Sequence, residues 1–101
     1  MFKKEGRYIT RGANEKLDLR LQLILWSMID KLNEDGKELD YLQVFKIRKC
    51  YEGIVIEHSQ EVPKYKEKYV LASDDVEVNE TLKVFVIDDE EYSTMMLSEE
   101  Y

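Results

Sequence analysis

Apolar residues between positions 19 and 35 recur at the three- and four-residue spacing that lines one face of an α-helix. Asp18 can accept a hydrogen bond from the first turn, and Gly36 stands where a left-handed residue commonly ends a helix. The pattern therefore predicts a long helix over residues 19–35. Its core-facing stripe consists of Leu21, Ile24, Leu25, Met28, Ile29 and Leu32.

The same helix carries a second, narrower apolar stripe formed by Leu19, Leu23 and Trp26. Three explanations stay open: the apolar segment 92–97 folds back over the stripe, the stripe binds a partner, or it is partly exposed without a role. Trp, Tyr and Met are over-represented in interfaces, which supports the second explanation. The candidate interface residues are Leu19, Leu23, Trp26, Tyr92, Met95 and Met96.

Alternating apolar and polar residues predict β-strands over residues 7–10, 40–50, 54–60, 64–71 and 81–87, with a turn over residues 11–14 after the first strand. The alternation slips near Gln43, which is typical of a bulge or of a strand covered on both faces. A two-residue turn at Glu52-Gly53 would pair Ile47 with His58.

These elements predict one domain, residues 1–101, of the α+β class. We expect a mostly antiparallel sheet of about five strands with one long helix packed on one face, in the order β-α-β-β-β-β. The apolar segment 92–97 has no clear period, and a short carboxy-terminal helix is one interpretation of it.

Charge is unevenly distributed along the 101 residues, whose net charge is −7. Residues 1–71 carry 14 Lys or Arg against 12 Asp or Glu, whereas residues 72–101 carry one against ten. A nucleic-acid partner is therefore not expected, because the last third would repel phosphates. The single cysteine suits a reducing compartment, and no apolar run is long enough to span a bilayer. We expect a cytoplasmic protein.

Few residues are suited to catalysis. The only His and Cys, His58 and Cys50, would lie on opposite faces of the predicted hairpin, and together they supply too few ligands for zinc. The acidic runs Asp88 to Glu91 and Asp74-Asp75 most simply solvate turns, with a divalent cation as the alternative. No catalytic, cofactor-binding or metal site is therefore assigned, and no cofactor is expected.

Lysines and tyrosines alternate over residues 64–69, a pattern weakly similar to strands that bind single-stranded nucleic acid. The strand period, however, sends Lys66 and Lys68 to one face and Tyr65 and Tyr69 to the other. The pattern is better explained by an edge strand that its lysines protect against aggregation.

Four stretches spread over the chain share one resemblance. They are Arg7 to Gly12, Leu21-Gln22-Leu23 with Leu25-Trp26-Ser27, Leu39 to Phe45, and Val86 to Met95 with Glu99-Glu100-Tyr101. In these the chain resembles, over nearly its whole length, a small bacterial and phage family of unknown function, DUF 960. The resemblance implies a free-standing small protein and brings no activity, cofactor or catalytic residue.

Taken together, the sequence favours an uncharacterised, non-enzymatic protein-interaction or regulatory module, with either an unknown protein partner or a second copy of the chain. The alternative is an acidic decoy of a nucleic-acid-binding site on a partner protein, motivated by the acidic last third. An enzyme of unrecognised type ranks last.

Overall fold

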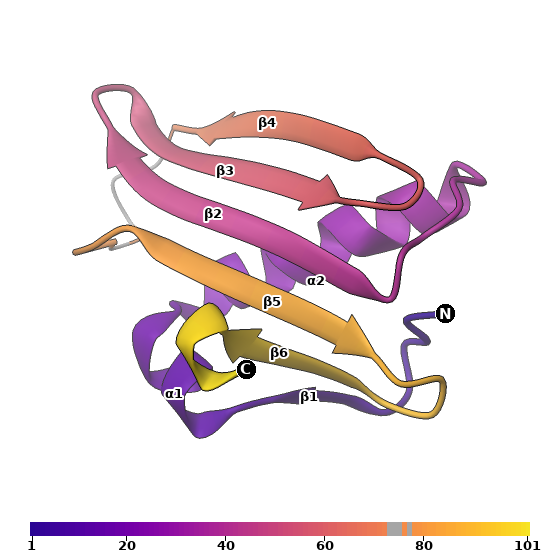
Figure 1. The fold of residues 1–101 in the computed structure, drawn as a ribbon. Helices are drawn as coiled ribbons and strands as arrows, with labels where there is room; N and C mark the ends of the chain where they lie inside the picture. Colours follow the sequence, from indigo (N-terminus) through magenta and orange to yellow (C-terminus); the bar gives the residue numbers. More distant parts are fainter. Residues whose placement is uncertain (73–75, 77) are drawn as a thin grey trace.

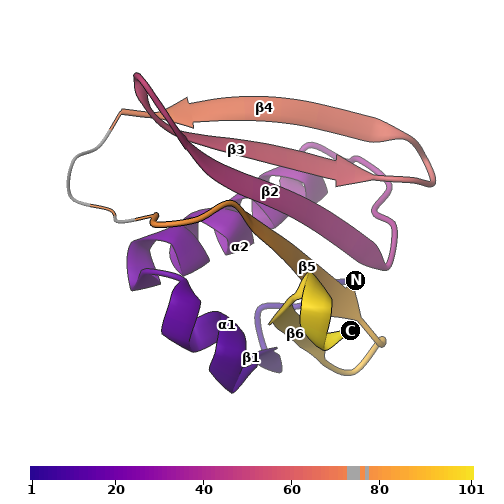
Figure 2. The ribbon, with the colours of Figure 1, turned by 60° about the vertical axis from the view of Figure 1, so that its left-hand side comes forward.

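One mixed sheet of six strands organises the fold, with helices on one of its faces (Figures 1 and 2). The computed structural model describes residues 1–72, 76 and 78–101. The strand order is β1-β6-β5-β2-β3-β4. Along the chain the elements are β1 (Arg7–Ile9), α1 (Arg11–Lys16), α2 (Leu19–Glu34), β2 (Leu42–Cys50), β3 (Gly53–Gln60), β4 (Tyr65–Leu71), β5 (Leu82–Asp88), β6 (Ser93–Leu97) and the 3₁₀ turn η1 (Ser98–Glu100).

The predicted α+β arrangement of about five mostly antiparallel strands with one long helix is wrong. The sheet has six strands and is mixed, because β1 and β6 pair in parallel, with Arg7 opposite Ser93 and Ile9 opposite Met95. Segment 92–97, for which a short helix was considered, instead supplies β6, whose residues alternate between buried and half-buried. The order along the chain is therefore β-α-α-β-β-β-β-β, followed by η1.

Helix α1 occupies the segment in which a turn was predicted. Thr10 caps it, because its Oγ1 accepts a hydrogen bond from the Ala13 backbone N–H at 3.2 Å. Ala13 is fully buried, so this short helix is fixed by packing as well as by its cap. The turn-forming residues of this segment therefore follow an N-cap, Thr10, and belong to a short helix that packs on the core through Ala13.

Helix α2 follows the local signals of the sequence. The Asp18 side chain accepts from the Arg20 N–H at 2.8 Å at its start. At its end Gly36 adopts φ +76, Lys37 N–H donates to Leu32 O, and Gly36 N–H donates to Asn33 O, which together make a Schellman motif. The buried face contains Leu21, Gln22, Leu25, Ile29 and Leu32, with Ile24 and Met28 at its margins.

In the β2–β3 hairpin the turn lies one residue earlier than predicted, which shifts the strand register by two residues. Cys50 pairs with Gly53 and Phe45 pairs with His58, so Tyr51 and Glu52 form the turn. Gly53 is the first residue of β3, where a Cβ would lie 2.2 Å from the Leu71 carbonyl oxygen. The glycine therefore permits close approach of β4 and does not form the turn. A shift of two residues leaves every side chain on its predicted face.

The core lies between α2 and the inner face of the sheet (Figure 2). Pairing runs without interruption along β2, so Gln43 marks no bulge but points inward and is fully buried. Phe2 is also buried, and its N–H donates to the Asp88 carboxylate at 3.1 Å, which fixes the amino-terminal segment to the end of β5. The fully buried apolar side chains include Leu21, Leu25, Ile29, Phe45, Ile47, Val84, Val86 and Met95.

Candidate functional site

The residues of the sequence-derived candidate interface do not form one surface. Leu19 and Leu23 are 65% and 60% exposed on α2, whereas Met95 is completely buried in β6. Tyr92 lies in the β5–β6 turn and packs edge-on against Tyr8, with ring centroids 5.5 Å apart. Because β6 is a strand between β1 and β5, its segment does not fold back over the Trp26 flank of α2.

Arg7 of β1 covers Trp26. Its Cζ atom lies 4.6 Å from the centre of the indole ring, and its guanidinium forms an ion pair with Asp30, one turn further along α2. Further hydrogen bonds from this guanidinium go to the carbonyl oxygens of Phe2 and Lys3. The indole is therefore partly buried by contacts within the chain, while Leu19 and Leu23 stay exposed.

Replacing Arg7 by alanine should expose the only tryptophan. Loss of the cation–π contact and of a half-buried ion pair should lower the free energy of unfolding by about 1–2 kcal/mol and shift Trp26 emission to longer wavelength. Fluorescence during urea unfolding measures both. Arg11→Ala is the matched control, because Arg11 and its partner Glu15 are 92% and 64% exposed; its cost should stay below about 0.5 kcal/mol. Equal effects of the two substitutions would contradict the covering role.

The face of the sheet opposite α2 has no helix over it in the described part of the chain, apart from the single turn η1 (Figure 1). We call it the open face. Strand register brings its outward residues into rows. One row joins Met96, Phe85, Val44, Ser59 and Lys66, and the next joins Thr94, Ile87 and Leu42. The apolar members of both rows are half-buried.

A third row of the open face is ionic. Lys83 of β5 pairs with Lys46 of β2, which pairs with Glu57 of β3, which pairs with Lys68 of β4. The Lys66 ammonium donates to Glu57 at 2.8 Å and lowers the pKa of this carboxyl, with attraction from Lys46 and Lys68 adding to the effect. Arg48 lies one position further along the face. This side of an acidic protein is therefore locally cationic.

The end of the chain lies across part of the open face, in front of β5 and β6 in Figure 1. Tyr101 packs edge-on against Phe85, with ring centroids 5.6 Å apart, and is itself 72% exposed. Glu100 holds this segment, because its Oε1 accepts from Thr10 Oγ1 at 2.7 Å and from the Leu97 N–H at 2.8 Å. The aromatic part of the open face is thus partly shielded by the chain's own tail.

On the inner face of the sheet, three buried polar side chains of β2 and β3 are linked by hydrogen bonds: His58, Gln43 and Gln60. His58 Nε2 lies 2.6 Å from Gln43 Oε1, and Gln43 Nε2 donates to Gln60 Oε1 at 2.7 Å. Gln60 Nε2 donates in turn to the carbonyls of Glu38 and Pro63. His58 is completely buried, stacks on Phe45 at 4.3 Å, and its Nδ1 has no hydrogen-bond partner among the described residues. Burial lowers its pKa to about 4, so the ring is neutral and sealed from substrates.

The other residues singled out from the sequence are also accounted for. Strand register places Cys50 on the face opposite His58. Asp88 does not solvate a turn as predicted: it is buried and accepts hydrogen bonds from the Phe2 N–H and Ser93 Oγ. Asp89 closes the β5–β6 turn by accepting from the Glu91 and Tyr92 N–H groups. Asp74 and Asp75 lie outside the described residues.

Metal-binding geometry is absent from what the structure describes: within residues 1–72, 76 and 78–101 no three His, Cys, Asp or Glu side chains are grouped closely enough to hold an ion. None of the helices in this part of the chain has both the length and the apolar character needed to span a bilayer.

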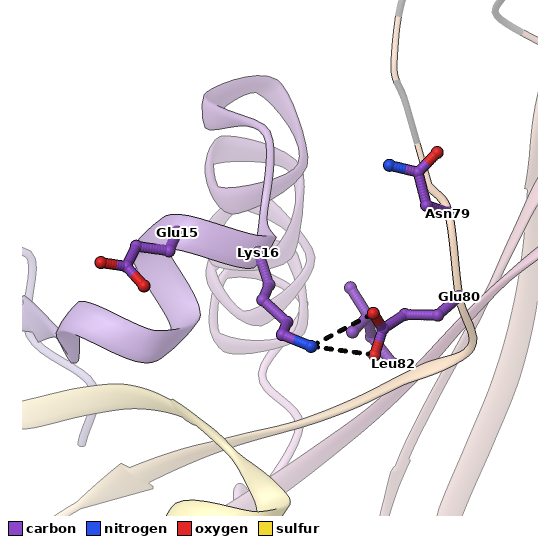
Figure 3. Close-up of a pocket in the computed structure, with 5 residues that line it drawn as sticks. All are labelled: Glu15, Lys16, Asn79, Glu80 and Leu82. Atoms are coloured by element: carbon purple, nitrogen blue, oxygen red, sulfur yellow. Dashed lines mark hydrogen bonds and ion pairs between the residues drawn. The ribbon is translucent and has the colours of Figure 1, made fainter.

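Two surface cavities are small compared with the roughly 300–1,000 Å³ of typical ligand pockets. One, of about 190 Å³, lies between α1 and the start of β5 (Figure 3). Lys16 reaches across it and donates to both Glu80 carboxylate oxygens at 3.0 and 3.1 Å, whereas Glu15 points away. The other, of about 220 Å³, is lined by Gln60, Tyr65 and neighbouring residues. Neither brings together groups suited to a reaction.

The sequence did not reveal the open face as a site. Lys46 and Lys83 are polar positions within mostly apolar strands, which by alternation alone would have indicated only that they point outward. Their juxtaposition depends on β2 pairing with β5, two strands that are not consecutive in the chain.

Comparisons with known proteins concern the fold and the family. The chain is similar to a protein of unknown function from Enterococcus faecalis, known from a crystal structure, with a TM-score of 0.83 and 24% identity over 99% of this chain and 94% of that one. This likeness shows a shared fold. No curated protein matches the chain. The family model described as a staphylococcal protein of unknown function, DUF960, matches residues 6–100, and the chain therefore belongs to this bacterial family.

Proposed function

We propose that this chain is a non-enzymatic protein-interaction module that binds a partner protein through the open face of its sheet. The observation that carries the proposal is the pair of apolar rows, half-buried and covered only in part by η1 and Tyr101, beside a cationic row. Apolar patches with a polar rim commonly mark binding surfaces, and aromatic residues and Met are over-represented in them. Met96 and Tyr92, two of the residues proposed from the sequence, belong to this side of the sheet.

Two further observations support binding as the activity. The buried titratable ring of His58 is sealed within the core, where no substrate reaches it. The cavities around Lys16 and Gln60 are smaller than pockets that enclose small-molecule substrates. A cytoplasmic location completes the proposal, in keeping with a single cysteine in the chain.

A second candidate contact lies on the opposite side of the molecule. Leu19 and Leu23 are one helical turn apart and both are largely exposed. Two leucines provide far less apolar area than a stable dimer interface requires, so we rank this contact below the open face.

Site-specific photo-crosslinking tests the proposal. Benzoylphenylalanine replaces Met96 on the open face in one variant and Leu23 on α2 in a matched variant, and each is irradiated in a staphylococcal lysate. We expect a discrete protein adduct from position 96 that disappears when Phe85→Glu is added, because a charge then sits in the middle of the apolar rows. Mass spectrometry of the adduct identifies the partner.

The outcomes separate the candidate surfaces. Adducts from position 23 and none from position 96 would contradict the use of the open face. An adduct of twice the chain mass, supported by sedimentation equilibrium of the purified protein, would identify the partner as a second copy. Absence of any adduct from either position would contradict the proposal as a whole.

A further inference from the structure

We infer that the open face recognises an acidic segment of its protein partner, with carboxylates placed against Lys46 and Lys83 and apolar side chains packed on Phe85 and Met96. This inference rests on the proposed function and names the chemistry of the partner.

The first observation is a like-charge pair in the middle of the sheet. Lys46 and Lys83 stand directly opposite each other on β2 and β5, and neighbouring strands are about 4.8 Å apart. Like charges directly opposite across strands destabilise a sheet. Lysines on an edge strand such as β4 prevent aggregation, but β2 and β5 are both interior strands, so this explanation does not apply to them.

The second observation is that the charges on this face do not balance. Glu57 is the single acidic residue at the outward positions of the six strands, and Lys66 already binds its carboxylate at 2.8 Å. Among the outward strand residues, Lys46, Lys68, Lys83 and Arg48 therefore outnumber Glu57, and the one intrachain contact described for Lys83 is with the Phe85 ring, 5.7 Å from its Nζ. Charge complementarity calls for an anionic ligand, even though the whole chain has a net charge of −7.

The third observation is the spacing between the cationic and apolar rows. Lys83 and Phe85 are two residues apart on β5, and Lys46 and Val44 are two residues apart on β2. Two residues of a strand span about 7 Å, so a carboxylate and an apolar side chain of one short segment can reach both rows. The occupant should combine both kinds of group within a few residues.

The character of the apolar rows favours a protein over a nucleic acid. Single-stranded nucleic acids bind on exposed aromatic rings, on which bases stack. Here Phe85, the one aromatic side chain of the two rows, is half-buried under Tyr101, and its neighbours Val44, Ile87 and Met96 are not aromatic. The exposed ring of Tyr101 is a single stacking position, without a second exposed ring beside it in the rows. Aliphatic and Met side chains pack well against apolar side chains of a protein.

Fluorescence anisotropy with defined probes tests the inference on the full chain. The probes are a labelled ten-residue peptide of alternating Glu and Leu, its Lys-for-Glu twin, and a ten-nucleotide oligothymidylate. We expect the Glu-Leu peptide to bind best. Lys46→Gln with Lys83→Gln should weaken its binding about tenfold or more, whereas the matched pair Lys31→Gln with Lys37→Gln, which removes the same charge elsewhere, should change it less than about twofold.

Several results would overturn the inference. They are no measurable binding of the Glu-Leu peptide, equal binding of the Lys-Leu twin, tighter binding of the oligothymidylate, or equal effects of the two charge-removing pairs. The photo-crosslinking assay distinguishes failure of this inference from failure of the proposed function. If the position-96 adduct persists in the Lys46/Lys83 variant while the acidic peptide fails to bind, the acidic partner is wrong and the protein-binding function stands.

A stability measurement provides an independent readout. Lys83→Glu places opposite charges across β2 and β5, so the midpoint of thermal unfolding should rise by about 2–4 °C while Glu-Leu binding is lost. A fall in the midpoint would show that Lys83 has a structural role, and would overturn the argument that the like-charge pair is kept for binding.

Discussion

Between pH 7 and pH 4 the free energy of unfolding should fall by roughly 3 kcal/mol because of one residue, His58. Its pKa is about 4 in the folded chain and about 6.5 when unfolded. Between these two pKa values the unfolded state is protonated at His58 and the folded state is not, so the free energy of unfolding rises with pH. The full contribution of His58 to stability is present at pH 7. On acidification it is lost as the pH falls from about 6.5 to about 4.

The hydrogen bonds around the ring explain why protonation is so unfavourable. The Gln43 amide nitrogen donates to Gln60 and to the Asp40 carbonyl, so its oxygen faces His58 and accepts from the Nε2–H. Nδ1 is then the unprotonated nitrogen, and no residue in the described part of the chain hydrogen-bonds to it. A proton added there would place an unsatisfied N–H and a positive charge in the core.

Urea unfolding at pH 7.0, 6.0, 5.0 and 4.5 measures this loss, most of which should occur above pH 4.5. The control is His58→Gln, which retains a donor near Gln43 but does not titrate. Glu57 and Asp18 have lowered pKa values, from 4.5 and 3.8, so their contributions are lost at lower pH than that of His58. A flat profile in the wild-type protein between pH 6.5 and 4.5, or the same fall in the variant, would refute the assignment.

Gly53→Ala should be the most damaging glycine substitution, lowering the free energy of unfolding by about 3 kcal/mol or more. A methyl group at this position would lie 2.2 Å from the Leu71 carbonyl oxygen and 3.1 Å from the Ala72 Cα. Both are backbone atoms, so the strand end itself must move. The φ of +142 at this residue is an additional cost for any L-amino acid with a side chain.

Gly36→Ala is the matched control for steric overlap. Gly36 has φ +76, and apart from its own chain neighbours no atom of the described residues lies within 4 Å of an added Cβ, so only the left-handed conformation is penalised, at about 1 kcal/mol. Chemical denaturation of both variants measures the difference. Similar losses for the two would mean that β4 moves away from Gly53 at little cost and that the close approach is not essential.

The sequence predicted best those features that depend on neighbouring residues. Helix α2 was found with its capping Asp18 and its terminating Gly36, because spacing and caps act within one or two turns. The hairpin was found with the wrong register, because Gly53 appeared to be a turn residue. A glycine is required at position 53 because the Leu71 carbonyl of β4 lies against it, a contact that the turn sequence does not predict.

Pairing between distant segments was not predictable in the same way. Strand β1 has three residues, and its partner β6 lies near the other end of the chain. The residues around either strand therefore do not predict which strand it pairs with. The same limit affected the candidate site. Summed along the chain, residues 72–101 looked uniformly acidic, yet Lys83 from that segment lies opposite Lys46 and makes the open face cationic.

The place of β6 between β1 and β5 has a consequence for synthesis on the ribosome. Until residues 93–97 emerge, the growing chain has a sheet whose β5 edge is unpaired and whose β1 segment has no neighbour. An unpaired edge is a template for association with other chains. Folding should therefore be completed only once β6 is available, and a chain truncated before Ser93 should aggregate more than one truncated after Leu97.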